Sequence, residues 1–180
     1  MAFSKHTFLF VIFFSFLTSD RASGQDTLYW QSGHKLLWQD FNAEPDSTVK
    51  QAAATYAGIT YHLIANDDSF KIKIVCYFLK SKSWSKYKSN DTLLMHERLH
   101  FDIAELFARK LRQSVAEYKF NPQTVGNDIE KLYVLNKQER LKMNEIYDKE
   151  TNHSQNFDKQ LIWNKKISVE LNAVKKYALD

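Results

Sequence analysis

The chain has 180 residues, 44% of them hydrophobic, and a formal net charge of +4 at pH 7. Its size fits one domain with a substantial core, and a single cysteine, Cys76, excludes an internal disulfide. The basic residues are scattered along the chain, and no nucleic-acid recognition motif accompanies them, so we expect no nucleic-acid partner.

The first segment has the features of a secretory signal peptide. Lys5 precedes an apolar run over residues 8–17, and Ala22-Ser23-Gly24 supplies small residues at the expected cleavage position. A run of about ten apolar residues is too short to span a bilayer, which takes about 20. We therefore predict cleavage near Gly24-Gln25 and a single domain over residues 25–180. This domain is secreted or periplasmic, without stable membrane insertion.

Strand-like segments fill the first half of the remaining chain. Residues 34–41, 55–64 and 70–79 are rich in β-branched and aromatic side chains, and the last of them alternates over Phe70, Ile72 and Ile74. Asn66-Asp67-Asp68-Ser69 predicts a hairpin turn between the second and third segments. Cys76 is interpreted as a buried structural thiol of the last strand. The basic, aromatic run at residues 80–88 is interpreted as a solvated loop.

Helical patterns dominate the second half, over residues 91–119, 136–149 and 156–178. The first begins at an N-cap, Asn90 or Asp91, and the Asn121-Pro122 pair stops it. Strands followed by helices predict an α+β fold, in which a small antiparallel sheet packs on a helical layer.

The central helix carries the motif His96-Glu97-Arg98-Leu99-His100. Side chains four positions apart lie one above the other on a helix, so His96 and His100 can bind one metal ion together. Glu97 projects to one side, where a general base reaches the water that the metal activates. The motif is typical of zinc-dependent hydrolases, and we expect one Zn²⁺.

A catalytic zinc normally has three protein ligands and an open fourth position. After the signal segment the other histidines are His34, His62 and His153. We predict His153 as the third ligand, because residues 147–154 are dense in groups that bind or orient metals, with Glu150 as the alternative ligand or as an orienting group. Tyr147 is a candidate donor to the oxyanion of a tetrahedral intermediate, although a core tyrosine is the commoner role for such a residue.

These segments together resemble the bacterial family of predicted secreted zinc-dependent proteases, a zincin-like domain of unknown function. The resemblance covers most of the chain after the signal segment and depends on residues 36–41, 96–102 and 147–153 with Gln160 and Trp163. It implies a zincin-like fold with the motif on the central long helix, a bound zinc, and a place for His153 in the site.

The resulting expectation is a secreted zinc peptidase that hydrolyses peptide or protein substrates, with Glu97 as general base. By analogy, residues 70–79 or the neighbouring strand line the substrate cleft. Two alternatives stay open: a non-catalytic binding domain that zinc stabilises, and a hydrolase of cell-wall peptide crosslinks.

Overall fold

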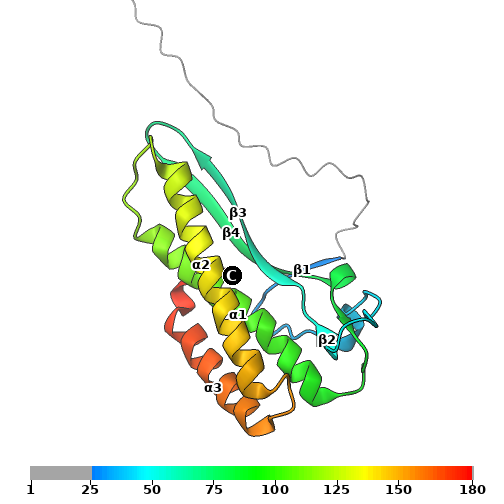
Figure 1. The fold of residues 1–180 in the computed structure, drawn as a ribbon. Coiled ribbons are helices and arrows are strands. Elements are labelled where there is room, and N and C mark those ends of the chain that lie inside the picture. Colours follow the sequence, from blue (N-terminus) through cyan, green and yellow to red (C-terminus); the bar gives the residue numbers. More distant parts are fainter. Residues whose placement is uncertain (1–25, 180) are drawn as a thin grey trace, which may run out of the picture.

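The computed structural model describes residues 26–179, so the predicted signal peptide and its cleavage site lie outside the described residues. The described chain forms a small antiparallel sheet beside three helices, which confirms the predicted α+β class. Figure 1 shows α1 (Asp91–Ala116) passing between the strands and the other two helices, α2 (Val125–Thr151) and α3 (Phe157–Ala173). Within residues 26–179, no helix combines the length and the apolar character that crossing a membrane requires.

The main sheet has three strands in the order β1-β4-β3, formed by β1 (Thr27–Tyr29), β4 (Phe70–Leu79) and β3 (Ala57–Ala65). Strand β4 has its predicted bounds, and β3 starts two residues later and ends one residue later than predicted. The turn between them forms as expected, because the Asn66 side-chain oxygen accepts hydrogen bonds from the backbone N–H groups of Asp68 and Ser69. Since β4 is central, β1 and β3 are the edge strands of this sheet.

Three elements of the first half differ from the sequence prediction, the first being β1, since no strand was predicted over residues 27–29. No strand forms over residues 34–41, where the structure has a 3-10 turn, Trp38–Asp40. The Asp40 carboxylate accepts the Leu37 N–H at 2.8 Å and closes this turn, while Leu36 and Phe41 insert into the core. A second small sheet, β2 (Ala53–Ala54) with β5 (Trp84–Ser85), was not predicted, because two-residue strands have no readable periodicity.

The basic run at residues 80–88 is a folded connection rather than a freely solvated loop. It contains a 3-10 turn, Lys80–Lys82, followed by β5. Three of its lysines are bound: Lys80 pairs with Asp40, and the ammonium groups of Lys86 and Lys88 donate to backbone carbonyl groups. These contacts fasten the connection to the first half of the chain.

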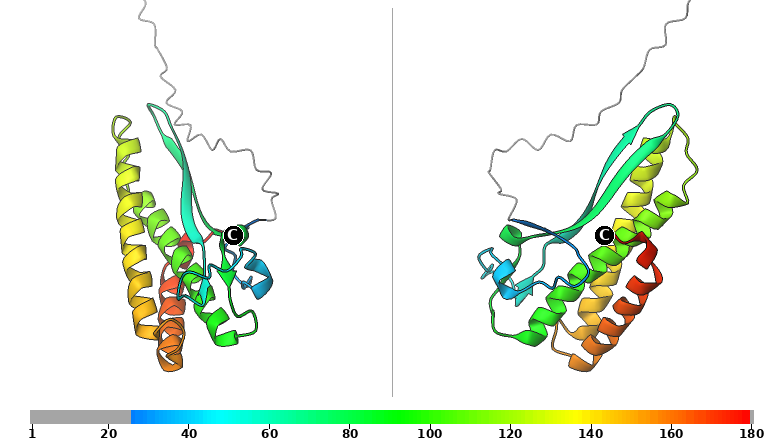
Figure 2. Two further views of the ribbon diagram at one scale, coloured as in Figure 1. Left: turned by 45° about the vertical axis from the view of Figure 1, so that its right-hand side comes forward. Right: turned by 180° about the vertical axis from the view of Figure 1, so that it is seen from behind.

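Helix α1 has nearly its predicted extent, and the Asn90 side chain caps it by accepting the Leu93 N–H at 2.9 Å. Helix α2 begins earlier than predicted, at Val125; Gly126 lies in its first turn, and no proline or further glycine interrupts residues 127–136. Helix α3 is followed by a 3-10 turn, Lys175–Tyr177, instead of continuing. Figure 2 shows α2 and α3 side by side against α1, with the long β3–β4 hairpin on the other side.

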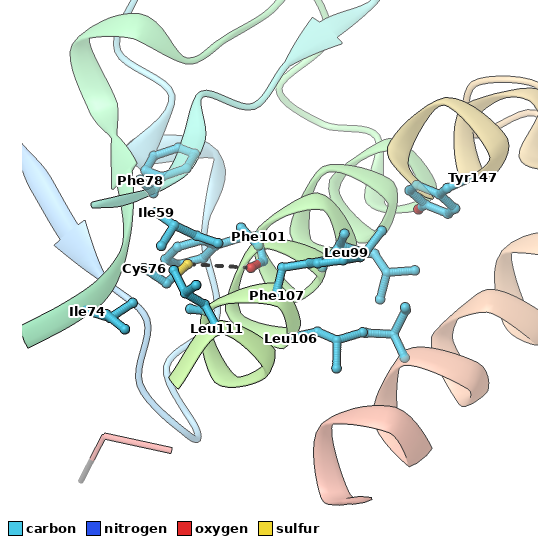
Figure 3. Packing of buried hydrophobic residues seen from close by; sticks show 14 of the residues in the cluster. Ile59, Ile74, Cys76, Phe78, Leu99, Phe101, Leu106, Phe107, Leu111 and Tyr147 are labelled. Atoms are coloured by element: carbon cyan, nitrogen blue, oxygen red, sulfur yellow. Dashed lines mark hydrogen bonds between the residues drawn. The ribbon is translucent and has the colours of Figure 1, made fainter. Parts of the chain in front are cut away.

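The core lies between the sheet and α1. Figure 3 shows Ile59, Ile74, Cys76 and Phe78 facing the α1 side chains Phe101, Phe107 and Leu111. Cys76 is 2% exposed and unpaired, as predicted for a structural thiol, and burial raises the pKa of its thiol well above the usual value. The packing fixes one face of α1 against the sheet and turns another toward α2 and α3, where the histidines lie.

Candidate metal centre

The two motif histidines lie in the first half of α1, on the side that meets α2. His96 is buried, with 4% of its side chain exposed, whereas 16% of the His100 side chain is exposed. Their rings are 4.9 Å apart between centroids. The predicted juxtaposition on one helical face is therefore present.

The third metal-binding group that the structure brings to this pair is Asp148, near the end of α2. Asp148 Oδ1 is 3.2 Å from His96 Nε2 and 3.0 Å from His100 Nε2. Among residues 26–179, His96, His100 and Asp148 are the one group of three potential ligands whose donor atoms all lie within 4.8 Å of one another. We refer to these three residues as the triad.

Amide oxygens on the opposite side of the rings orient both imidazoles. His96 Nδ1 is 3.1 Å from Gln160 Oε1 on α3, and His100 Nδ1 is 2.9 Å from Asn144 Oδ1, one turn before Asp148. An amide oxygen only accepts, so Nδ1 of each ring donates to it, and Nε2 of each ring faces Asp148. Nε2 can bind a metal through its lone pair or, without a metal, donate a proton to the Asp148 carboxylate. Metal-bound histidines are typically held by such an outer hydrogen bond.

The triad fits the donor set of a zinc site. In a tetrahedral site with zinc–ligand bonds of about 2.0–2.1 Å, adjacent ligand atoms lie about 3.3 Å apart. The two Nε2-to-Oδ1 distances, 3.2 and 3.0 Å, are close to this spacing. Two imidazole lone pairs and a carboxylate converging in this way require additional protons or a cation between them, and a divalent cation satisfies all three.

The electrostatics of the triad show how strongly its members interact. Burial by itself would raise the pKa of Asp148, but the hydrogen bonds from His100 and His96 outweigh it and hold the pKa below the usual range. Burial by itself would lower the pKa of His100, yet Asp148 and the nearby Glu97 raise it. The site therefore favours a negative carboxylate facing positive charge.

Glu97 lies beside the triad without belonging to it. Its side chain is buried, and its Oε2 accepts a hydrogen bond of 2.7 Å from the hydroxyl of Thr55, which connects β2 to β3. Thr55, a residue of the sheet region, thus fixes the orientation of the Glu97 carboxylate. This support orients the carboxylate that the sequence predicts to be the general base.

Tyr147 lies beneath the two imidazoles and is fully buried. Its ring stacks on His96 at a centroid distance of 4.5 Å and meets His100 edge-on at 5.0 Å. The hydroxyl donates to Gln160 Oε1 at 2.8 Å and lies 3.1 Å from the backbone carbonyl of His96. Tyr147 is therefore placed to support the rings from inside, and its hydroxyl faces the core instead of a substrate.

The two residues predicted as third ligand do not join the triad. Glu150 accepts a hydrogen bond from the Trp163 indole N–H at 2.9 Å and so links α2 to α3. His153 is exposed and follows the end of α2, in a run of three left-handed residues, Asn152 to Ser154, with φ of 47°, 50° and 77°. This turn redirects the chain after the end of the helix. Asp148, within the last helical turn, faces α1, and His153 does not join the triad.

Sequence reasoning missed Asp148, Asn144 and the contact of Gln160 with His96. One signal was available: Asn144 and Asp148 are four positions apart, the same spacing as His96 and His100. His96 contacts Asp148, and His100 contacts Asn144, so the two pairs face each other between helices running in opposite directions. The spacing was visible, but the pairing of the helices was not.

The site is open on one side, where 31% of the Asp148 side chain is exposed. Asp148 and Asn144 line a shallow hollow along α2 that extends from Leu141 to His153. The hollow therefore connects the exposed part of Asp148 to solvent. Compared with family models, with curated proteins and with solved structures, the chain has no match.

Proposed function

We propose that this protein is a zinc-dependent peptidase of the zincin type, with His96, His100 and Asp148 as the zinc ligands and Glu97 as the general base. The observation that carries the proposal is the convergence of two outwardly hydrogen-bonded imidazoles and one carboxylate at the spacing of a tetrahedral zinc site. The resemblance noted in the sequence also points to a zinc-dependent protease, but it implied His153 where this proposal has Asp148. We further propose, from the predicted signal peptide, that the protein works outside the cytoplasm.

Each residue of the site has a separate part in this proposal. When bound, zinc supplies a Lewis acid that polarises a carbonyl group and makes water acidic enough to ionise near neutral pH. Glu97 takes a proton from the attacking water and transfers it to the leaving amine. Thr55 keeps the Glu97 carboxylate oriented through its 2.7 Å hydrogen bond. Gln160, Asn144 and Tyr147 hold the imidazoles in place.

The alternative of a purely structural zinc has less support. A structural zinc normally has four protein ligands, whereas the triad supplies three and leaves an exposed side. The Glu97 carboxylate next to the triad also favours catalysis, since a structural zinc site requires no general base. We therefore favour catalysis over a zinc-stabilised binding domain.

Peptide hydrolysis that depends on the metal tests the proposal directly. The purified protein is incubated with one equivalent of Zn²⁺ and a mixture of peptides, and the products are identified by mass spectrometry. We expect cleavage that a chelator abolishes and that added Zn²⁺ restores. A protein that binds one zinc but leaves every peptide intact would contradict the peptidase proposal and favour a binding domain.

Replacing Gln160 with alanine is expected to weaken zinc binding by roughly 10–100-fold, because His96 Nδ1 loses the acceptor that fixes its tautomer. The measurement is competition for zinc against a chromophoric chelator. Gln138→Ala, an exposed change on α2, is the matched control and should leave the affinity unchanged. Unaltered affinity in Gln160→Ala would show that Gln160 does not orient His96.

A further inference from the structure

The outer edge of β3 starts beside Glu97 and leads away from the triad along α2, whose Tyr133 hydroxyl donates to the Ile59 carbonyl at 3.2 Å. Thr55, which holds Glu97, is two residues before Ala57, the first residue of β3. The carbonyl of Ala57 points away from β4 toward α2, where it accepts a hydrogen bond of 3.3 Å from Arg140 Nη1. At about 3.3 Å per extended residue, Ala57 lies about 7 Å from Thr55. Arg140 therefore binds β3 two residues along the chain from the threonine that holds the proposed catalytic carboxylate.

Arg140 lacks an acidic partner. Within residues 26–179 no carboxylate lies within 4.0 Å of its guanidinium, and the bond to Ala57 is its one hydrogen bond. A guanidinium has five N–H donors in a planar fork that matches a carboxylate. The side chain is half-buried, so it is partly desolvated while its remaining donors stay available. Half-buried arginines without counter-ions are suited to binding an anionic group.

The Tyr77 side chain of β4 lies over Gly58 of β3, the residue after the Ala57 that Arg140 binds. Gly58 pairs with Tyr77, and a Cβ atom at position 58 would lie only 2.8 Å from the Tyr77 hydroxyl oxygen. The ring thus extends across Gly58 toward the outer edge of β3. Burial raises the pKa of Tyr77, so its hydroxyl stays protonated as a donor, and the positive charge of Arg140 acts on the same group.

Further positive charge lies near this pair, on the side of Tyr56. Tyr56, 45% exposed, precedes Ala57, and Lys82 Nζ lies 5.0 Å from the centre of the Tyr56 ring. Lys82, like Arg140, forms no salt bridge within residues 26–179. Arginine and tyrosine are the side chains most enriched where proteins bind their partners. The edge of the sheet beside the site is therefore cationic and rich in hydroxyl donors.

We propose that Arg140 and Tyr77 form a subsite that binds a carboxylate of the peptide substrate. This inference rests on the proposed peptidase function and specifies its substrate class: peptides that carry a carboxylate about one to three residues from the bond that is cleaved. Arg140 supplies paired N–H donors, and Tyr77 donates its hydroxyl. The carboxylate has two sources, the C-terminus of a short peptide or an acidic side chain.

Binding to the inactive zinc-loaded Glu97→Gln variant tests the subsite without requiring turnover. Fluorescent peptides of one parent sequence are compared by anisotropy: a free against an amidated C-terminus, and glutamate against glutamine at each internal position. We expect one carboxylate form to bind roughly 10–100-fold more tightly than its neutral counterpart, the range of a charge-assisted hydrogen-bonded pair. The position of the effect distinguishes the C-terminal from the side-chain source.

Variants on the Glu97→Gln background assign the effect to the subsite. Arg140→Gln is expected to remove the preference for the carboxylate, Arg140→Lys to retain part of it, and Gly58→Ala to reduce it by displacing the Tyr77 hydroxyl. Lys142→Gln is the matched control, because it removes one positive charge from an exposed position of α2 and should leave the preference intact. Circular dichroism checks that each variant is folded.

The outcomes separate this inference from the proposed function. Equal binding of carboxylate and neutral peptides, or a preference that persists in folded Arg140→Gln, overturns the subsite. If the wild-type protein cleaves peptides without regard to their charge, the peptidase proposal stands and the subsite fails. If carboxylate peptides bind preferentially but the wild-type protein cleaves none of them, the subsite stands and the catalytic proposal fails.

Discussion

Replacing Asp148 with alanine should lower the affinity for zinc by roughly 10²–10⁴. A structural zinc site typically contributes on the order of 10–16 kcal/mol of binding free energy, and an equal share for each of three ligands is about 3–5 kcal/mol. Asp148 Oδ1 lies within 3.2 Å of both imidazoles, so its removal leaves two neutral ligands without the charge that neutralises the cation. Metal content by mass spectrometry and competition titration with a chelator measure the loss.

His153→Ala and Glu150→Ala are the matched controls for Asp148, since both residues come from the same end of α2. Each is expected to retain one zinc per chain with nearly unchanged affinity. Glu150→Ala should lower stability instead, because the Trp163 indole N–H loses its 2.9 Å acceptor. Loss of zinc in His153→Ala, with retention in Asp148→Ala, would reverse our assignment and restore the ligand set expected from the sequence.

Glu97→Gln is expected to reduce the turnover rate for peptides by roughly 10²–10⁴, the typical contribution of a general base. The amide keeps the size of the side chain and can still accept a hydrogen bond from Thr55 Oγ1, so the fold and the triad should be preserved. Zinc content should therefore stay at one per chain while hydrolysis is lost. Steady-state kinetics and metal analysis on the same preparation separate the two effects.

Glu145→Gln serves as the control for the Glu97 variant, because it removes the same charge from an exposed position at the hollow beside the triad. We expect this control to retain turnover within a few-fold of the wild type. A Glu97→Gln variant that hydrolyses peptides as fast as the Glu145→Gln control would exclude Glu97 as the base. A variant that loses its zinc would instead assign Glu97 a role in holding the triad together.

Much of the fold could be predicted from local patterns. Strand β4 alternates between inward and outward side chains, and α1 has an apolar stripe with a polar cap at Asn90, so both elements form where their periodicity indicates. Residues 34–41 also read as a strand, since apolar and aromatic side chains dominate them. The Asp40 carboxylate instead closes a 3-10 turn there, a side-chain contact that propensities do not describe.

The site, like the fold, has one part that local sequence patterns predict and another that they do not. The spacing of His96, Glu97 and His100 by itself determined that two imidazoles and a carboxylate share a helix, because helical geometry alone places them. The tertiary structure decided the third member of the triad: α2 packs against α1 in the opposite direction and presents Asp148 to both imidazoles, while the left-handed turn after Thr151 leads His153 away. Contacts between helices depend on how they dock, and local sequence spacing does not encode docking.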